Sequence, residues 1–403
     1  MKKLSASTLV FLLIVLAFGF FSYASFGEKI VFMAAGTPER DAFFAFKGKQ
    51  DHENRAKAAF PTEITFKFPS KFNVFYEDNF PFRSFLINKF QKLRKKIKDD
   101  PRVIVGFDNW MYSNSSPQAV YAKTGNILGD FTGKTLLNEK DEKLFTANMA
   151  CQKKFFDANG IRFLVMAPPN KISVYPEHLP KAYRNQQAQK IRYEQVESIL
   201  NGLGIEFVNV KKPILEAKSK GQVYFKTDTH WSQLGAYIGF RALTRRFGHE
   251  FPEMTGIKRH MLDCGDVYNM SVSLSGSCVD INDVPLLPED TDGECVRSPR
   301  DQKIVCTNSR APVDGKVLIV RDSMFSSLID YTRRTFKNAV LLWRSMHTEQ
   351  ELLEEIKREK PTAVIYETGE RYMMELQNAA MCPEAYVEIE RLDQRAPAVP
   401  QKK

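Results

Sequence analysis

Three patterns that assign many chains to a functional class are missing from this sequence. Its six cysteines include no Cys-x-x-Cys pair, which argues against a structural zinc site. It has no Gly-rich loop of the type that cradles phosphate groups, and therefore no recognisable site for a nucleotide or for coenzyme A. No nucleic-acid-binding module is recognisable, and the basic residues are spread along the chain rather than gathered in one arm. We therefore expect no metal, no organic cofactor and no nucleic-acid partner.

The composition suits a folded protein of ordinary size. Of the 403 residues, 43% are hydrophobic, which is enough to bury a sizeable core in one large or two ordinary domains. The formal net charge is +10. Such a charge favours an acidic polymer, a nucleic acid or an anionic membrane surface as partner, while an ordinary solvated surface explains it equally well.

The first 26 residues indicate the compartment. Met1-Lys-Lys is a short basic region, and residues 9–21 form an apolar run. This pattern is typical of a cleaved export signal or a single membrane anchor, and either one places the rest of the chain outside the cytoplasm. Ser22-Tyr23-Ala24 provides a cleavage site, whereas the length of the apolar segment and the basic residues before it favour an anchor.

Residues 27–100 show little regular patterning. Charged residues and prolines interrupt them, so we expect a linker with peripheral helices. Within this part, residues 82–98 predict an amphipathic helix with a basic face. Such a helix packs its apolar stripe on a core or lies on an anionic surface, and packing is the commoner arrangement.

From residue 101 onwards, strand patterns alternate with helix patterns. Strands separated by helices of ten or more residues favour parallel pairing, so we expect an α/β domain in which a mostly parallel sheet lies between two layers of helices. Ligands of such sheets bind outside the carboxyl ends of the strands. The predicted strands are 103–105, 161–166, 205–210, 339–343 and 362–366, and the predicted helices are 139–159, 185–201, 349–360 and one from Arg371.

Two segments carry the side chains of a candidate nucleophilic site. Residues 223–237 predict a strand, a turn and a helix, and the turn holds Asp228 and His230. Residues 315–329 predict a strand that leads through Ser323 into a helix. A carboxylate orients an imidazole, an imidazole activates a serine hydroxyl, and helix N-terminal N–H groups suit an oxyanion. Alone, each motif is more often a structural hydrogen bond or a helix cap, but their joint placement at two strand ends favours catalysis.

Residues 260–310 are rich in cysteine, glycine and polar residues, with little periodicity. In an exported chain this composition predicts an irregular insertion stapled by two disulfides. The favoured pairing, one of three, joins near neighbours: Cys264 with Cys278, and Cys295 with Cys306. Cys151 and Cys382 are left over, and they either pair or stay free. A zinc site is the competing interpretation of these cysteines.

Taken together, these segments resemble the SGNH-like alginate O-acetyltransferase family, the AlgJ and AlgX group, in which the Asp-His pair also precedes the serine. Thr227-Asp-Thr-His-Trp231 is the most distinctive match. The other similar motifs are Phe80-Pro-Phe-Arg83, Gly106 to Tyr112, Ala167-Pro-Pro-Asn-Lys171, Tyr175-Pro176 and Tyr366 to Arg371. AlgX-like proteins carry a carbohydrate-binding module after the catalytic domain, for which this sequence shows no room, so the resemblance is closer to AlgJ.

The resemblance implies an SGNH-hydrolase-like domain over residues 101–385 and a tail at 386–403. It implies that Ser323 carries an acetyl ester, and that the acceptor is a hydroxyl of an exported, acidic polysaccharide such as alginate. A membrane-bound acyltransferase partner would supply the acetyl group. The protein would work in the periplasm, anchored to the inner membrane by its N-terminal segment.

One position departs from the family pattern. The residue before Asp-Ser is usually glycine, and here it is Arg321. If the turn requires a positive φ or a close backbone approach, a large side chain there is costly. The arginine is then tolerated, reshapes the entrance for the acyl donor, or marks a degenerate enzyme. Arg344 and Trp231 are candidate substrate-binding residues, with a solvent-facing and a core position as the respective alternatives.

Three other functions remain open at this point. A carbohydrate esterase would use the same three side chains and pass the acetyl group to water. A non-catalytic polysaccharide-binding or scaffold subunit of an export complex would need neither Ser323 nor His230. A metal-dependent hydrolase would use a different set of side chains: Asp228, His230, His260 and Asp263.

Overall fold

The computed structural model describes most of the chain from residue 102 onwards. The described residues are 102–114, 124–271, 278–290, 292–300 and 302–384. They lie in the compact unit Asp100–Lys403. The predicted N-terminal segment 1–26, the linker 27–100 and the tail 386–403 lie outside the described residues. Among the helices of the described part, none has both the length and the apolar character needed to cross a membrane.

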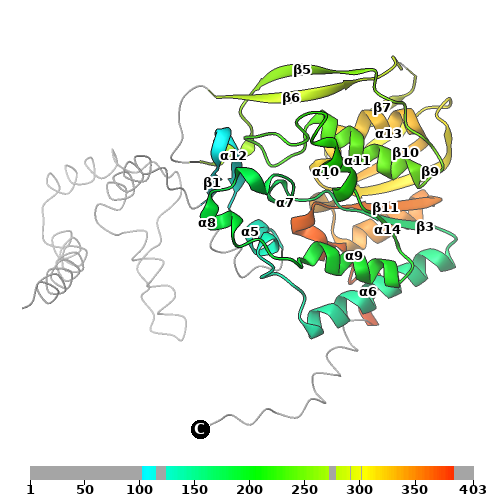
Figure 1. Cartoon of the computed structure of the whole chain (residues 1–403). Coiled ribbons are helices and arrows are strands. Elements are labelled where there is room, and N and C mark those ends of the chain that lie inside the picture. The colour runs from blue at the N-terminus through cyan, green and yellow to red at the C-terminus, as the bar shows by residue number, and fades with distance from the viewer. Residues whose placement is uncertain (1–101, 115–123, 272–277, 291, 301, 385–403) are drawn as a thin grey trace, which may run out of the picture. The chain divides into compact units, whose positions relative to one another are not determined.

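A seven-stranded sheet forms the centre of this unit (Figure 1). In spatial order its strands are β4 (Glu206–Val208), β3 (Arg162–Met166), β11 (Ala363–Glu367), β9 (Val313–Arg321), β10 (Phe336–Trp343), β8 (Ile304–Thr307) and β7 (Glu294–Arg297). The first five run parallel. At one edge β8 pairs antiparallel with β10, and β7 pairs antiparallel with β8. Every residue of β11 is buried, as expected for a parallel strand with both faces covered.

The two faces of the sheet bury two separate apolar clusters. Successive residues of a strand point to opposite faces, so Leu164 of β3 belongs to one cluster and Val165 to the other. The first face is covered by α10 (Lys211–Ala217), α11 (Gln233–Arg245) and α13 (Ile329–Thr335), and the second by α6 (Glu139–Ala158), α9 (Arg192–Gly202) and α14 (Glu349–Glu359). This three-layer α/β/α arrangement with a mostly parallel sheet confirms the predicted fold class.

The long helices begin and end at local sequence signals. The Asn138 side chain caps α6 by accepting a backbone hydrogen bond from its first turn at 2.9 Å. Gly160 follows the helix with a φ of +66°, a conformation that favours glycine. At α14, Thr348 and Glu351 form a capping box. These helices therefore agree with the predicted ranges 139–159 and 349–360.

Other helical segments are shorter than predicted. The helix expected over 185–201 starts only at Arg192, because the Glu194 side chain accepts the Ile191 N–H and caps the helix there. The helix expected from Arg371 is a 3-10 helix. The short elements are α5 (Ile127–Phe131), α7 (Lys171–Val174), α8 (Lys181–Arg184), η1 (Phe107–Asn109), η2 (Pro176–His178), η3 (Met324–Leu328), η4 (Arg344–Met346) and η5 (Glu370–Leu376).

Two predicted strands do not join the central sheet. β1 (Val103–Val105) pairs antiparallel with β2 (Met111–Ser113) in a separate two-stranded sheet. The apolar run from Val223 forms only an isolated bridge between Tyr224 and Trp231. The prediction of a strand before Asp228 is therefore wrong. The apolar side chains of this run are buried in the core, but its backbone closes a loop on itself instead of pairing with a neighbouring strand.

The cysteine-rich region is more regular than predicted. β5 (Gly256–Asp263) and β6 (Val279–Leu286) form a long antiparallel pair, and α12 (Asp266–Met270) lies between them in the chain. β8 pairs with β10, so the end of the region extends the central sheet. The prediction of an irregular insertion is therefore wrong. The sequence did not reveal β5 because this strand is largely exposed and lacks the apolar alternation of a half-buried strand.

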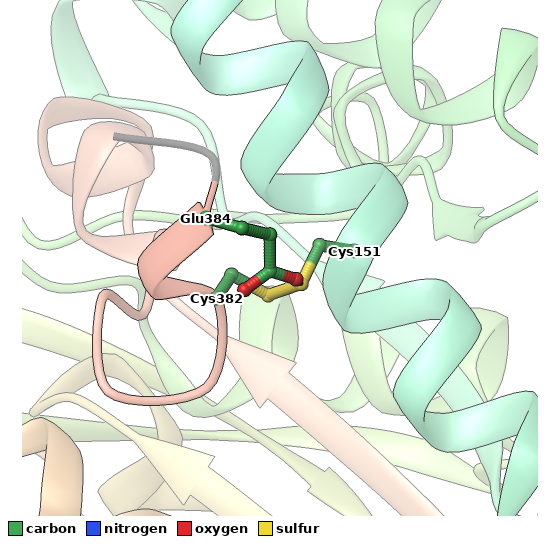
Figure 2. A group of neighbouring side chains, drawn as sticks. All are labelled: Cys151, Cys382 and Glu384. Atoms are coloured by element: carbon green, nitrogen blue, oxygen red, sulfur yellow. A yellow bond between two sulfur atoms is a disulfide. The ribbon is translucent and has the colours of Figure 1, made fainter. Parts of the chain in front are cut away.

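All six cysteines lie in the described part of the chain and are paired. The structure joins Cys264 to Cys278 and Cys295 to Cys306, the near-neighbour pairing. A third disulfide joins Cys151 of α6 to Cys382, next to Glu384 (Figure 2). Because this crosslink spans 231 residues, it restricts the unfolded chain strongly.

Candidate active site

Asp228 and His230 contact each other in the loop between Phe225 and Trp231. His230 Nδ1 lies 2.6 Å from Asp228 Oδ1, and the His230 backbone N–H donates to the same oxygen at 2.9 Å. The two contacts fix the ring plane. They leave Nε2 as the ring nitrogen that is open to another partner.

Ser323 occupies that second position. It lies two residues after Arg321, the last residue of β9, and directly before η3, and its Oγ lies 2.8 Å from His230 Nε2. One imidazole therefore bridges a carboxylate and a hydroxyl. Ser323 lies at a strand end as predicted, whereas Asp228 and His230 approach that end from a loop.

The loop holds its shape through its own backbone. The Phe225 N–H donates to the His230 carbonyl at 3.2 Å, and the Ser232 N–H donates to the Val223 carbonyl at 3.0 Å. The Ser232 side chain then caps α11. These hydrogen bonds hold the loop that carries Asp228 and His230 between the apolar run and α11.

Trp231 connects this loop to the turn of the serine. Its Nε1 donates to the Met324 carbonyl at 2.9 Å, and its side chain is fully buried. Gly239 of α11 makes room for the ring, because a Cβ there would lie 2.9 Å from Trp231 Cζ3. The burial agrees with the alternative of a core residue, and substrate binding by Trp231 stays a prediction.

Lys171 supports the loop through hydrogen bonds to its backbone. It begins α7 just after β3 and is buried. Its Nζ donates to the carbonyl oxygens of Phe225, Lys226 and Asp228 at 3.1, 2.9 and 2.6 Å. Burial lowers the pKa of Lys171 to about 7, although nearby carboxylates, with Asp228 foremost, act in the opposite direction.

The cysteine-rich region supports the Asp228 carboxylate. Asp266 of α12 accepts hydrogen bonds from the backbone N–H and the hydroxyl of Thr229, at 2.7 and 2.6 Å. The Asp266 N–H donates to Asp228 Oδ2 at 3.0 Å. Gly265 approaches so closely that a Cβ there would lie 2.2 Å from Asp228 Oδ2. The chain enters this segment directly from the Cys264–Cys278 disulfide.

Asp280 of β6 holds the beginning of the same loop. Its buried carboxylate accepts the backbone N–H groups of Lys226 and Thr227 at 3.1 and 2.7 Å. Two carboxylates of the cysteine-rich region, Asp266 and Asp280, therefore contact the loop on either side of Asp228. Sequence reasoning missed this support, as it missed the role of Lys171.

The charge on Asp228 is strongly favoured in the folded state. Burial alone would raise the pKa of its carboxyl group, but the hydrogen bond and charge of His230 outweigh this effect. The backbone N–H groups of Asp266 and His230 add to it. The pKa of Asp228 therefore lies well below its usual value, and the group is a carboxylate throughout the neutral range.

Asp322 fixes the turn that carries Ser323. Its carboxylate accepts the N–H groups of Met324 and Gly369 at 2.7 and 2.8 Å, which links the ends of β9 and β11. Its own N–H donates to the Glu367 carboxylate at 3.0 Å. Within the part of the chain that the structure describes, the Ser323 N–H has no acceptor, so this donor is available to an oxyanion.

Arg321 fits this turn without backbone strain. It ends β9, and no residue of the turn is among the positive-φ residues of the described chain. Its fully buried guanidinium stacks on Trp343 of β10, with Cζ 3.9 Å from the ring centroid. The turn therefore shows no positive φ that a large side chain would strain, and the Arg321 side chain is buried.

Arg344 is held by neighbours in the fold. Its Nη2 donates to the Glu375 carbonyl at 3.1 Å and lies 3.9 Å from the Glu349 carboxylate. It begins η4 at the carboxyl end of β10. Substrate binding by Arg344 stays a prediction.

The ligand set expected for a metal-dependent hydrolase does not assemble. In the described part of the chain, Asp228 and His230 come within 4.8 Å of a third possible ligand, Asp266. His260 and Asp263 lie on the exposed part of β5 and do not belong to this group. The His230 ring is already hydrogen-bonded at both nitrogens, an arrangement that suits proton transfer.

Comparison with known families agrees with the fold. Residues 103–267 match the family model described as SGNH hydrolase-like domain, acetyltransferase AlgX. This match confirms the predicted resemblance. It includes Asp228 and His230 and ends before Ser323.

Two curated relatives are each named probable alginate O-acetylase AlgJ. The relative from Pseudomonas syringae pathovar tomato is 24% identical over 201 residues, which are 49% of this chain and 47% of the relative. The relative from Pseudomonas fluorescens is 24% identical over 226 residues, which are 55% of this chain and 51% of the relative. The chain thus spans about half the length of the curated relatives it matches.

Solved structures of similar fold include the O-acetyltransferase domain of Pseudomonas putida AlgJ. The identity is 18% and the TM-score is 0.45, and the similarity covers 73% of this chain and all of that domain.

Proposed function

We propose that this chain is an O-acetyltransferase that moves an acetyl group through Ser323 onto hydroxyls of an exported, acidic polysaccharide such as alginate. The observation that carries the proposal is the imidazole of His230, which lies 2.6 Å from the Asp228 carboxylate and 2.8 Å from the Ser323 hydroxyl. This is the geometry that a nucleophile, its base and an orienting carboxylate require.

In the first half-reaction, Ser323 Oγ attacks the carbonyl carbon of the acetyl donor, and His230 Nε2 accepts the hydroxyl proton. The carbonyl electrons move to oxygen, and the resulting oxyanion accepts a hydrogen bond from the Ser323 N–H. The bond to the leaving group then breaks, and His230 returns the proton to that group. An acetyl ester remains on Ser323, while the Asp228 carboxylate stabilises the transient imidazolium.

In the second half-reaction, a sugar hydroxyl takes the place of the leaving group. His230 Nε2 removes the hydroxyl proton as the sugar oxygen attacks the acetyl carbonyl. The oxyanion forms at the same donor and collapses with cleavage of the ester bond to Ser323. The proton returns to Ser323 Oγ, so the chain is regenerated without a cofactor.

The acceptor class rests on charge and on relatives. The chain carries a formal net charge of +10, which attracts an acidic polymer better than a neutral one. Two curated relatives, which this chain matches over about half of their length, are named probable alginate O-acetylase AlgJ. An acidic exopolysaccharide with free hydroxyls is therefore the acceptor that we propose.

The compartment and the donor follow from the N-terminal sequence. Residues 1–26 combine a basic start with an apolar run, and all six cysteines are paired, as suits an oxidising compartment. We infer a periplasmic location with the N-terminal segment as an inner-membrane anchor. Because that compartment has no pool of coenzyme A thioesters, a membrane-bound acyltransferase would supply the acetyl group.

A carbohydrate esterase is the second candidate, because the side chain of His230 is 28% exposed and water can reach it. The two activities are separated by incubating the full chain with a chromogenic acetyl ester and a deacetylated alginate oligosaccharide. We expect acetylated oligosaccharide by mass spectrometry, no transfer by Ser323→Ala, and less transfer to a neutral oligosaccharide of equal length. Release of free acetate alone would favour the esterase.

A further inference from the structure

The buried guanidinium of Arg321 contacts the peptide that joins Asp322 to Ser323. Its Nη1 donates to the Asp322 carbonyl oxygen at 3.3 Å and to the Ser326 hydroxyl at 3.0 Å. Both partners belong to the turn of the nucleophile. The other two nitrogens of the group, Nε and Nη2, are buried without a hydrogen-bond partner.

The charge of this group persists at neutral pH. Burial lowers the pKa of Arg321 to about 10, with Glu367 acting in the opposite direction. The side chain is therefore a cation, and among the described residues its hydrogen bonds go to the turn of the nucleophile. Burying a cation with so few partners is costly, so its position beside the nucleophile calls for an explanation.

The carbonyl of Asp322 and the N–H of Ser323 are the two ends of one conjugated peptide unit. A donor that draws electron density onto the carbonyl oxygen makes the N–H at the other end a stronger donor, since hydrogen bonds in a chain polarise one another. The Ser323 N–H has no acceptor among the described residues, and it belongs to the residue that carries the acetyl ester in the proposed function.

We propose that Arg321 is a positioning residue that polarises the Asp322–Ser323 peptide and so strengthens the Ser323 N–H as the oxyanion donor. This inference rests on the proposed function of Ser323.

The test compares Arg321→Met, which keeps an extended side chain against Trp343 but removes the cation, with Arg321→Lys, which keeps the cation. Because negative charge develops on the carbonyl oxygen in the transition states and the tetrahedral intermediate but not in the bound ester, the loss should fall on kcat and leave KM unchanged. We expect about a tenfold loss of kcat in Arg321→Met, short of the roughly 10²–10³-fold loss caused by removing a whole donor. Arg321→Lys should retain more activity than Arg321→Met.

A spectroscopic measurement separates polarisation from packing. The full chain is acetylated with an ester labelled with ¹³C at the carbonyl, and the carbonyl stretch of the acetyl-Ser323 ester is recorded by infrared difference spectroscopy. A weaker donor shifts this band to higher frequency, so we expect that shift in Arg321→Met. Ser326→Ala, which removes only the other partner of the guanidinium, serves as the matched control and should leave the band unchanged.

The outcomes distinguish this inference from the proposed function. If the wild type is acetylated on Ser323 but Arg321→Met shows neither a loss of kcat nor a band shift, the inference is wrong and the proposed function stands. A parallel change in kcat and KM without a band shift would also overturn it, because that result indicates packing alone. If Arg321→Met does not fold, Arg321→Ala takes its place. An Arg321→Ala variant with the same kcat and the same carbonyl stretch as the wild type would also overturn the inference. If the wild type forms no acetyl-Ser323, the proposed function and the inference both fail.

Discussion

Lys171 Nζ lies 2.6 Å from the carbonyl oxygen of Asp228, the residue whose carboxylate orients the candidate base. Lys171→Met would remove this donor from three loop carbonyls. The Lys226 carbonyl keeps the Met111 N–H as a donor, whereas each carbonyl left unsatisfied costs about 1–3 kcal/mol. We predict a lower melting temperature and a fall of at least about tenfold in kcat/KM, since the loop would shift His230 relative to Ser323. Ester turnover and thermal unfolding measure the two effects.

The matched control is Lys143→Met on α6. Lys143 is exposed and pairs only with Glu139, so its removal should change stability by less than about 1 kcal/mol. Equal turnover by wild type, Lys143→Met and Lys171→Met would contradict a positioning role for Lys171.

The low pKa of Lys171 predicts a pH dependence of stability. The unfolded chain binds this proton up to pH 10.5, whereas the folded chain releases it at about 7, so the unfolded state binds more protons between these values. Stability therefore rises with pH across this window. We expect the difference in unfolding free energy, wild type minus Lys171→Met, to increase between pH 7 and pH 10.5 by at most about 1.4 kcal/mol per pH unit. Denaturant titrations that give a constant difference would refute this.

Gly265 is the position at which a single methyl group should disable the site. A Cβ would lie 2.2 Å from Asp228 Oδ2, although the φ of −89° is open to any residue. We predict that Gly265→Ala displaces the carboxylate and lowers kcat/KM by about tenfold or more, because small misplacements of catalytic groups are costly. Gly202→Ala is the control, since nothing lies within 4 Å of the added atom. Comparable activity in both variants would argue against a required close approach.

The disulfides predict a separation of stability from activity. Double alanine substitution can remove either the Cys264–Cys278 or the Cys295–Cys306 disulfide. The two disulfides close loops of similar length, because their cysteines are separated by 14 and 11 residues in sequence. Each loss should cost about 3 kcal/mol of stability. Only the first should also lower kcat, because Gly265 and Asp266 follow Cys264 directly and contact Asp228. Chemical denaturation and ester turnover on both variants test this, and an equal effect on kcat would contradict it.

Removal of metal ions distinguishes the proposed serine mechanism from that of a metal-dependent hydrolase. Asp228, His230 and Asp266 lie near enough to share an ion, but His230 is bonded to Asp228 and Ser323 through its two nitrogens. We predict that a chelator leaves ester turnover unchanged and that a serine-directed sulfonyl fluoride abolishes it. Loss of turnover in chelator that zinc restores would instead support a metal-dependent hydrolase.

The elements that could be predicted from the sequence are those with local determinants. α6 begins at Asn138 and ends before Gly160, and α14 begins at a capping box, so their bounds depend on residues within one turn. β11 is a continuous apolar run, typical of a parallel strand inside a sheet. The pairing of Asp228, His230 and Ser323 was expected from their placement at two predicted strand ends and from the family resemblance. The structure brings the three side chains together, although the first of those strands does not form.

The supporting residues could not be predicted because their partners are distant in sequence. Lys171 lies 54 to 57 residues from the carbonyls it contacts, and an isolated lysine usually indicates a solvated surface. Asp266 and Asp280 stand in a polar region whose strands are recognisable only from their pairing. The run at Val223 has strand periodicity, but in the structure its pairing is limited to one isolated bridge between Tyr224 and Trp231.

The central claim is that Ser323 carries the acetyl group, and intact mass spectrometry tests it most directly. The full chain and Ser323→Ala are each incubated with a chromogenic acetyl ester and analysed before and after proteolysis. We predict an acetyl-sized mass increase on the wild type that maps to the peptide containing Ser323 and is missing from Ser323→Ala. A wild type that neither gains this mass nor releases the chromophore, or an adduct that persists in Ser323→Ala, would contradict the account.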